Sequence, residues 1–276
     1  MTTSRRSFLK ASAFASLGGA LSAASTAHAA DEATLKLPSK WDAETEVLVA
    51  GSGIAGMSAA ISAVDKNAKV LVLEKGKNYG GCAIINGGII ALGGGTRTQK
   101  EHGVEDSPEL LYKKLTNPLH HEYRKNTPEL IAKYSTWCPE TQVWLENHGV
   151  RFLPTFTKPG KYDSQHHESY HHIWWSDSGV GGRKPQPSGG FMTGRGIMMP
   201  FYQYFTGKGG QILLEHKLLD VYVSPEGAVI GAKVQNPDGG IMNIKASKGV
   251  VLAGGSWKAN PELRRLTDPR FTENMI

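Results

Sequence analysis

Two short apolar runs near the start of the chain flank a segment of small residues. Residues 46–50 (EVLVA) and 69–73 (KVLVL) have the length and β-branched content of buried strands. Between them, Gly51-Ser-Gly53-Ile-Ala-Gly56 leads into a stretch rich in Ala and Ser. The pattern predicts a strand, a tight turn, a closely packed helix and a second, parallel strand.

Each glycine of this turn has a separate physical use. Gly51 allows the tight turn after the strand, Gly53 lets a pyrophosphate approach the backbone, and Gly56 lets the helix pack close to the strand. The helix N-terminus offers free N–H groups to phosphates. Glu74 ends the second strand, where an acid can bind ribose hydroxyls. An ordinary Gly-rich turn would not place all these parts in register, so we expect a bound dinucleotide.

The segment after Glu74 is unusually rich in glycine. It contains Gly80-Gly81, Gly87-Gly88 and Gly93-Gly-Gly95 followed by Thr96. Such a stretch suits a loop lying against a large planar ligand, with the main chain making the hydrogen bonds. A flexible linker is the alternative, and it is disfavoured by five apolar residues: Ile84, Ile85, Ile89, Ile90 and Leu92.

Two helix starts follow in the middle of the chain. Ser107-Pro108-Glu109 and Thr127-Pro128-Glu129 each place a capping residue, a proline and an acid in helical order. We expect the second helix to run to about Asn147. Its buried surface is expected to come largely from Leu130, Ile131, Tyr134, Trp137, Val143, Trp144 and Leu145.

Residues 152–190 break into irregular, Pro- and Gly-rich chain that contains a cluster of histidines and tryptophans, residues 166–175. His167 and His171 could share a helix face and bind a metal. The alternatives are a loop that lines or covers the entrance to an active site, and an ordinary surface loop. We assign no metal site.

From Gly210 the rhythm changes to short β-runs. Residues 211–215, 218–224, 228–235 and 241–246 are separated by turn residues such as Pro225-Glu-Gly227. We expect an antiparallel meander over about 210–247, attached to the main sheet. Residues 248–253 are then expected to return as a parallel strand, and Asn260-Pro261 to begin a further helix.

Three of these motifs together resemble the fumarate reductase/3-ketosteroid dehydrogenase flavoprotein family, also described as FAD-dependent oxidoreductase 2. They are the Gly51–Gly56 turn with Glu74, the glycine pairs that follow it, and the late strand Val250-Val-Leu-Ala-Gly-Gly-Ser. The resemblance covers roughly residues 45–271. It implies an α/β fold: a Rossmann-like FAD-binding domain with a parallel sheet, an antiparallel β-meander and a helical insertion over about 105–150. It also implies hydride transfer between flavin and a carbon next to an activating carbonyl.

Matched position by position, the resemblance implies contacts to FAD from four parts of the chain. These residues are Gly51, Ser52, Gly53, Ile54, Ala55, Gly56 and Glu74; Lys75, Gly81, Cys82, Ala83, Gly87 and Gly88; Val221, through its backbone to adenine; and Ala253 and Gly254. The chain departs from the family pattern at Cys82-Ala83, where the family usually has Asn followed by Ser or Thr. It also departs in the late strand, which reads Ala253-Gly-Gly-Ser where the family more commonly has Ala-Thr-Gly-Gly.

The family's catalytic arginine, substrate clamps and capping domain would follow Ile276. We therefore expect an N-terminal portion that is incomplete and inactive alone, with an incomplete FAD-binding domain over residues 30–276, and we name no catalytic residue. Members of the family that tether FAD do so through a histidine shortly after the paired glycines, and residues 82–95 contain none, so we expect non-covalent FAD. We expect a fumarate- or urocanate-type reductase acting on an unsaturated carboxylate or enone. The alternatives are a 3-ketosteroid dehydrogenase type, one half of a two-chain enzyme, and a non-catalytic flavin-binding remnant.

The N-terminus predicts export. Ser4-Arg5-Arg6 with Phe8-Leu9-Lys10 matches a twin-arginine signal, and Ala27-His-Ala29 offers a cleavage site, so residues 1–29 would be a signal peptide. A short amphipathic helix is the alternative. The twin-arginine route carries folded proteins, so it would deliver a cofactor-loaded enzyme to the periplasm or an equivalent compartment.

Composition narrows the partners further. The net charge of +6 would fall to +3 on cleavage, because three basic residues and no acid would leave, and the remaining basic residues are dispersed, so no nucleic-acid partner is expected. No later apolar run has the roughly 18 residues of a membrane span. The chain has no haem-attachment motif, so we expect a separate electron-transfer protein. Cys82 and Cys138 could form a disulfide or be two buried thiols.

Overall fold

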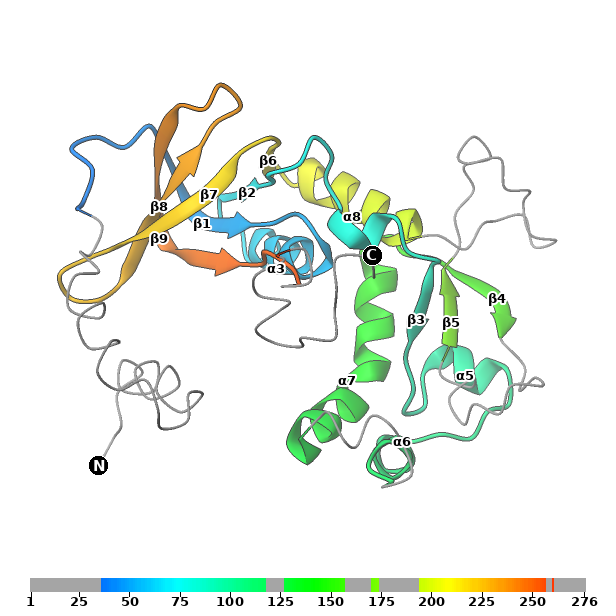
Figure 1. The fold of residues 1–276 in the computed structure, drawn as a ribbon. Helices are drawn as coiled ribbons and strands as arrows, with labels where there is room; N and C mark the ends of the chain where they lie inside the picture. The colour runs from blue at the N-terminus through cyan, green and yellow to red at the C-terminus, as the bar shows by residue number, and fades with distance from the viewer. Residues whose placement is uncertain (1–35, 118–126, 157–169, 174–193, 257–259, 261–276) are drawn as a thin grey trace, which may run out of the picture.

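The computed structural model describes residues 36–117, 127–156, 170–173, 194–256 and 260. Its main sheet has six strands in the order β6-β2-β1-β9-β8-β7 (Figure 1). The strands are β1 (Ala43–Ala50), β2 (Val70–Leu73), β6 (Gln211–Leu213), β7 (Lys217–Val223), β8 (Val229–Gln235) and β9 (Ile241–Leu252). β1 pairs in parallel with both β2 and β9, and helix α3 (Ile54–Val64) connects β1 to β2. The predicted parallel unit and α/β class are confirmed.

Strand β9 belongs to both halves of the sheet. Residues 241–245 of β9 pair antiparallel with β8, and residues 244–252 pair in parallel with β1, so the two pairings overlap at Ile244 and Lys245. Two strands were expected here, over 241–246 and 248–253, and they are one. The chain stays continuous through a bulge, because Thr45 pairs with Ala246 but Val47 pairs with Gly249. The first β-run expected in the antiparallel meander, residues 211–215, is also not part of it, because β6 pairs in parallel with β2.

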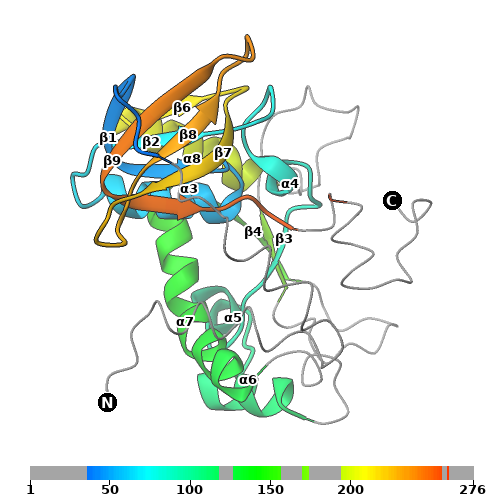
Figure 2. The same ribbon diagram turned by 60° about the vertical axis from the view of Figure 1, so that its left-hand side comes forward.

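The two faces of the sheet pack against different partners (Figure 2). Val49 and Val72 pack with helices α3 and α8 (Arg195–Gly207), whose fully buried side chains include Met57 and Phe201. The alternate residues of the strands pack instead with the meander in a second cluster. Its buried members are Leu48, Leu71, Leu73, Ala232, Val234, Ile244 and Ala246. This alternation buries both faces of the short parallel strands.

The helical insertion contains α5 (Arg97–Glu101), α6 (Pro108–Leu115) and α7 (Pro128–Asn147). It begins before the expected residue 105, since α5 shares polar contacts with α7. The two expected starts and the end at Asn147 are confirmed. The Ser107 hydroxyl accepts the Leu110 N–H at 3.2 Å, whereas Thr127 caps α7 without a side-chain hydrogen bond.

The expected buried face of α7 is partly wrong. Ile131 and Leu145 are buried, but four apolar side chains are 42–59% exposed: Leu130, Tyr134, Trp137 and Val143. The cause is that α7 extends from the core toward α5 and α6, so only part of its surface meets other elements (Figure 2). Its buried side also carries the polar residues Ser135 and Gln142.

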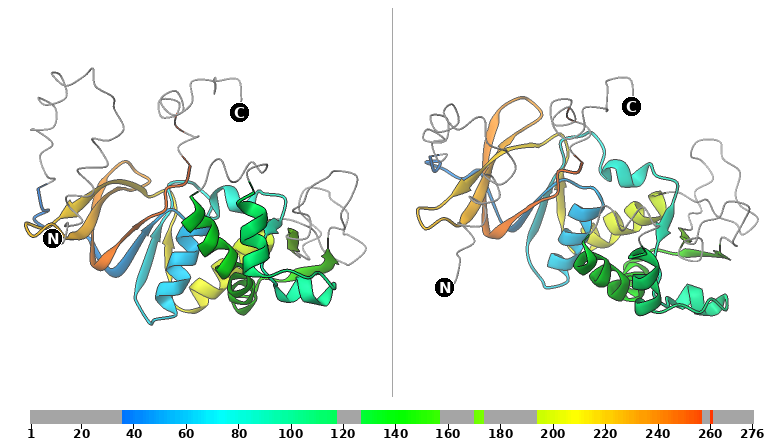
Figure 3. Two further views of the ribbon diagram at one scale, coloured as in Figure 1. Left: turned by 90° about the horizontal axis from the view of Figure 1, so that it is seen from below. Right: turned by 60° about the horizontal axis from the view of Figure 1, so that its bottom comes forward.

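A second, three-stranded antiparallel sheet lies beside the insertion (Figure 3). It consists of β3 (Ile89–Ala91), β5 (Tyr170–Ile173) and β4 (Phe152–Phe156). The expectation of irregular chain over 152–190 is therefore wrong at both strands, and His171 and His172 lie on a strand rather than a helix or loop. His166 and His167 lie outside the described residues. So do the signal over residues 1–29 and the helix expected from Pro261.

Two further observations bear on the sequence expectations. Cys82 is exposed, Cys138 is buried and both are free thiols, so neither the disulfide nor the pair of buried thiols is found. Within the described ranges, no helix is long and apolar enough to cross a membrane.

Candidate cofactor site

The turn between β1 and α3 is held by contacts that only glycine permits. Gly51 has φ +109°, and a Cβ there would lie 2.2 Å from the carbonyl oxygen of Ala253. A Cβ on Gly56 would lie 1.8 Å from the carbonyl oxygen of Gly51. These two glycines therefore bring the helix, the turn and the end of β9 into direct backbone contact, as the motif predicts.

Gly53 lies in the same turn but has neither constraint. Its φ of −68° suits any residue, and a Cβ there would meet nothing within 4 Å. It precedes the first turn of α3, whose N–H groups have no intrahelical acceptor, and no side chain caps this end. The first turn also carries no acid. Open space, free N–H donors and the positive end of the helix dipole together fit a pyrophosphate group.

Glu74 connects the two glycine-rich loops through Ser52. Its Oε2 accepts the Ser52 hydroxyl at 2.6 Å and the Ser52 N–H at 3.1 Å, while Oε1 accepts the Gly76 N–H at 2.8 Å. The fully buried Ser52 hydroxyl in turn accepts the Gly80 N–H at 3.0 Å. The carboxylate thus fixes the geometry of both loops in addition to the ribose role that the sequence predicts.

The protonation state of Glu74 follows from these contacts. Burial alone would raise the pKa of the Glu74 carboxyl, but the Ser52 hydroxyl, the Gly76 and Ser52 N–H groups and the charge of Lys75 lower it below its ordinary value. The ionised carboxylate keeps lone pairs on both oxygens, so it can still accept ribose hydroxyls.

The second glycine-rich loop, residues 75–88, lies directly against the Gly51–Gly56 turn. Gly81 begins a short helix, α4 (Gly81–Ile84), where only a loop was expected. A Cβ on Gly81 would be 3.4 Å from the Cα of Gly53, so the two backbones are neighbours. Cys82 and Ala83 lie on this helix, and none of its residues is buried. Gly88 has φ +72°, and a Cβ on Gly87 would meet nothing within 4 Å.

The end of the late strand lies against the β1–α3 turn, whereas Val221, which is expected to contact adenine, lies elsewhere in the sheet. The Ala253 N–H donates to the Ala50 carbonyl at 2.8 Å, and a Cβ on Gly254 would meet nothing within 4 Å. Val221 pairs with Ala232 on the edge strand β7, three strands from β1 in the sheet order.

The chain segment that adjoins Glu74 is the turn between β6 and β7, which sequence reasoning did not single out. The Glu215 N–H donates to the Gly76 carbonyl at 3.0 Å and the His216 N–H to the Glu74 carbonyl at 2.9 Å. Glu215 has φ +57°, an uncommon conformation for a residue other than glycine. No residue pattern marks this turn, because its contacts to Glu74 are made by the backbone.

The glycines of residues 93–95 are used differently from the expectation of a ligand-facing loop. A Cβ on Gly94 would lie 2.7 Å from the Ser135 carbonyl, and one on Gly95 would lie 2.8 Å from the Asp106 carbonyl. The Gly95 N–H donates to Gln99 Oε1 at 3.0 Å. These glycines let the chain pack against the helical insertion.

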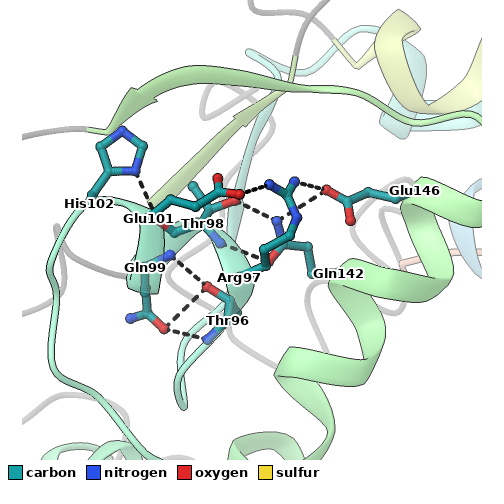
Figure 4. A network of polar contacts seen from close by, with 8 residues as sticks. All are labelled: Thr96, Arg97, Thr98, Gln99, Glu101, His102, Gln142 and Glu146. Carbon is teal, nitrogen blue, oxygen red and sulfur yellow. Dashed lines mark hydrogen bonds and ion pairs between the residues drawn. The ribbon is translucent and has the colours of Figure 1, made fainter.

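A polar network continues from this turn into α5 and α7 (Figure 4). Thr96 and Gln99 form a reciprocal capping box at the start of α5, and the Gln142 amide of α7 donates to the Thr98 hydroxyl. Arg97 forms ion pairs with Glu101 and with Glu146. Since Gln99 and Gln142 are fully buried, the network holds the insertion together as a structural unit.

The geometry agrees with comparisons to known proteins. Residues 46–275 match the FAD binding domain family. The chain is 29% identical over 241 residues to the acrylate reductase flavoprotein subunit of Shewanella woodyi, covering 84% of this chain and 43% of that protein.

Solved structures of two enzymes are similar to the chain. The 3-ketosteroid-Δ4-(5α)-dehydrogenase of Rhodococcus jostii has a TM-score of 0.70 at 28% identity, with 84% of this chain and 50% of that chain covered. A flavocytochrome c3 fumarate reductase has a TM-score of 0.67 at 25% identity, covering 92% of this chain and 39% of that chain. The chain thus spans half or less of each protein's length. It belongs to the FAD binding domain family of flavoprotein oxidoreductases, and its cofactor is FAD.

Proposed function

We propose that this chain holds FAD, without a covalent bond, for an enzyme that reduces an activated carbon–carbon double bond next to a carbonyl, as a fumarate- or urocanate-type reductase does. The observation that carries the proposal is the open backbone at Gly53, bordered by the free N–H groups of α3 and by the Ser52–Glu74 contacts. Bound FAD would supply hydride exchange with the substrate carbon.

The residues of the chain would bind and orient the cofactor. The amino end of α3 would hold the pyrophosphate at Gly53, and Glu74 would accept hydrogen bonds from ribose. The backbone of Gly81, Cys82, Ala83, Gly87 and Gly88 would lie along the flavin. Ala253 and Gly254 would contact it from the end of β9, and Val221 is proposed to contact adenine. The residues that bind substrate and move protons are not assigned.

The substrate class is proposed from the names of the relatives. The acrylate reductase subunit of Shewanella woodyi and the urocanate reductase of Eggerthella lenta are named for small unsaturated carboxylates. A ketosteroid dehydrogenase activity is the second candidate, and the similarity to the Rhodococcus jostii enzyme favours it. We also propose twin-arginine export of the folded protein and a separate electron-transfer protein as the reductant.

The decisive experiment is Gly53→Ala. The added methyl group fits the described chain and suits the backbone, so the free energy of unfolding should fall by no more than about 1 kcal/mol, the cost of alanine at a helix N-cap. The methyl group would, however, fill the space proposed for the pyrophosphate. We expect the Kd for FAD to rise about 10- to 100-fold. Gly207→Ala is the matched control, because it also adds a methyl group in open space but at the far end of α8.

FAD binding is measured by quenching of flavin fluorescence. Unchanged affinity in Gly53→Ala, or no binding by the unaltered protein, would reject the site. Acid precipitation separates the two attachment modes, since a yellow pellet would contradict non-covalent FAD. Oxidation of a reduced viologen dye by acrylate, fumarate, urocanate or a steroid enone identifies the substrate class. The dye assay is made on the product of the full-length gene, and a product that binds FAD but oxidises the dye with none of them would support the non-catalytic alternative.

A further inference from the structure

Gly194, the N-cap residue of α8, lies against α4, the helix that is proposed to face the flavin. A Cβ on Gly194 would be 1.7 Å from the Ala83 carbonyl oxygen and 2.9 Å from Cγ of Asn86. The Gly194 N–H donates to the Asn86 carbonyl at 3.1 Å, and Asn86 Oδ1 accepts the Gly88 N–H at 2.7 Å. Gly194 has φ −60°, so its lack of a side chain serves close packing and not an unusual backbone angle.

Helix α8 also contacts Tyr79, which lies just before α4 in the chain. The Tyr79 hydroxyl donates to Met199 Sδ at 2.7 Å. The Tyr79 ring stacks on the Tyr202 ring, with centroids 4.3 Å apart and planes 11° from parallel. Helix α8 thus contacts the chain both before α4, at Tyr79, and after its start, at Ala83 and Asn86.

The two helices differ in how firmly they are anchored. In α8, Ile197, Met198, Phe201 and Phe205 are buried in the core, whereas α4 has no buried residue. Moving α8 would open the core, while moving α4 breaks few packing contacts. A group inserted between them should therefore displace α4.

We infer that Gly194 is a positioning residue for the cofactor: through its contact with Ala83, α8 sets where the backbone of α4 meets the flavin. The inference rests on the proposed function. It adds Gly194, at the start of α8, to the residues proposed to determine how FAD is bound. The contact is made with main-chain atoms, which suits a helix whose Cys82 and Ala83 side chains offer few hydrogen bonds.

The test compares Gly194→Ala with Gly207→Ala, the same substitution at the two ends of one helix. For Gly194→Ala we expect a Kd for FAD about tenfold higher, and a shift in both the visible absorption of the bound flavin and its midpoint potential. Gly207→Ala should match the unaltered protein in all three. The spectrum and potential report on the flavin's surroundings, which a loss of stability alone would not alter.

Tyr79→Leu is the second variant, since it removes the stacked ring and the hydroxyl but introduces no clash. It should shift the flavin spectrum in the same way, by a smaller amount. If Gly194→Ala does not fold, Tyr79→Leu decides. Unaltered affinity, spectrum and potential in the folded variants would overturn the inference while leaving the FAD site in place. Failure of the unaltered protein to bind FAD would instead reject the proposed function.

Discussion

Two glycine-rich turns, Gly51–Gly56 and Gly93–Gly95, look alike in sequence and differ in structure. In the first, Gly51 and Gly56 are packed against backbone while Gly53 faces open space. In the second, added Cβ atoms would meet Leu111, Ser135 and Asp106. A glycine run therefore indicates close approach to the backbone but does not indicate what approaches.

The surroundings of the two turns explain this difference. The first follows a buried strand and opens a helix of 11 residues, so it presents unsatisfied N–H groups at a fixed place. In the second, the Gly94 N–H donates to Asp106 Oδ2 and the Gly95 N–H to Gln99 Oε1, both from the helical insertion or its flank. Donors already satisfied within the chain have little to offer a ligand.

The largest effect should come from Gly56→Ala. The added Cβ would lie 1.8 Å from the Gly51 carbonyl oxygen and 3.3 Å from Cβ of Ala253, and neither neighbour is a flexible side chain. We expect the free energy of unfolding to fall by about 3 kcal/mol or more, measured by urea denaturation. Gly53→Ala, three residues earlier, is the control. Equal stability of the two variants would contradict the division between packed and open glycines.

A smaller loss of stability, without loss of cofactor, should follow from Asp106→Ala. Asp106 Oδ2 accepts the Gly94 N–H and the amide of the fully buried Gln99, both at 2.8 Å. Removing this acceptor should lower the free energy of unfolding by about 2 kcal/mol. Since these groups face the insertion, the Kd for FAD should remain within about twofold.

Glu105→Ala, at the exposed neighbouring position, serves as its control and should change neither quantity. Urea denaturation and flavin fluorescence are measured on the same samples. A large loss of FAD affinity in Asp106→Ala, with little loss of stability, would show that the Gly93–Gly95 turn is part of the cofactor site.

Local sequence order was enough to predict the elements whose signals are short and contiguous. The strand–turn–helix–strand unit ending at Glu74 and the proline-marked starts of α6 and α7 are of this kind. Their residues lie next to one another in the chain, so turn geometry and capping chemistry specify them directly.

The rest depended on contacts between distant segments. Helix α8 was not predicted, although Ile197, Met198, Phe201 and Phe205 have helical spacing, because Pro200 and the flanking glycines obscured it. The exposed Trp137 and Leu130 were expected to be buried, since periodicity does not reveal how far a helix extends beyond the core. The hydrogen bonds from the His216 N–H to Glu74 and from the Glu215 N–H to Gly76 are made between backbone atoms, which leave no residue signature.

The smallest expected change in stability, and the one that depends on pH, is that of Glu74→Gln, which alters the Gly51–Gly56 turn but not the Gly93–Gly95 turn. The pKa of Glu74 is lowered in the folded chain, so its carboxylate stabilises the fold above the unfolded-state pKa of about 4.3, and that contribution is lost as pH falls through the folded-state value. At pH 7 the free energy of unfolding of the variant should be about 1 kcal/mol lower, because Ser52 and Gly76 lose a charged hydrogen-bond acceptor. As the pH falls below about 4.3 the difference should narrow, and it should vanish once the pH is below the lowered pKa of the folded-state carboxyl. Urea denaturation at several pH values measures the difference; a gap that does not narrow on acidification would show that the ionised carboxylate does not hold the first turn to the second loop.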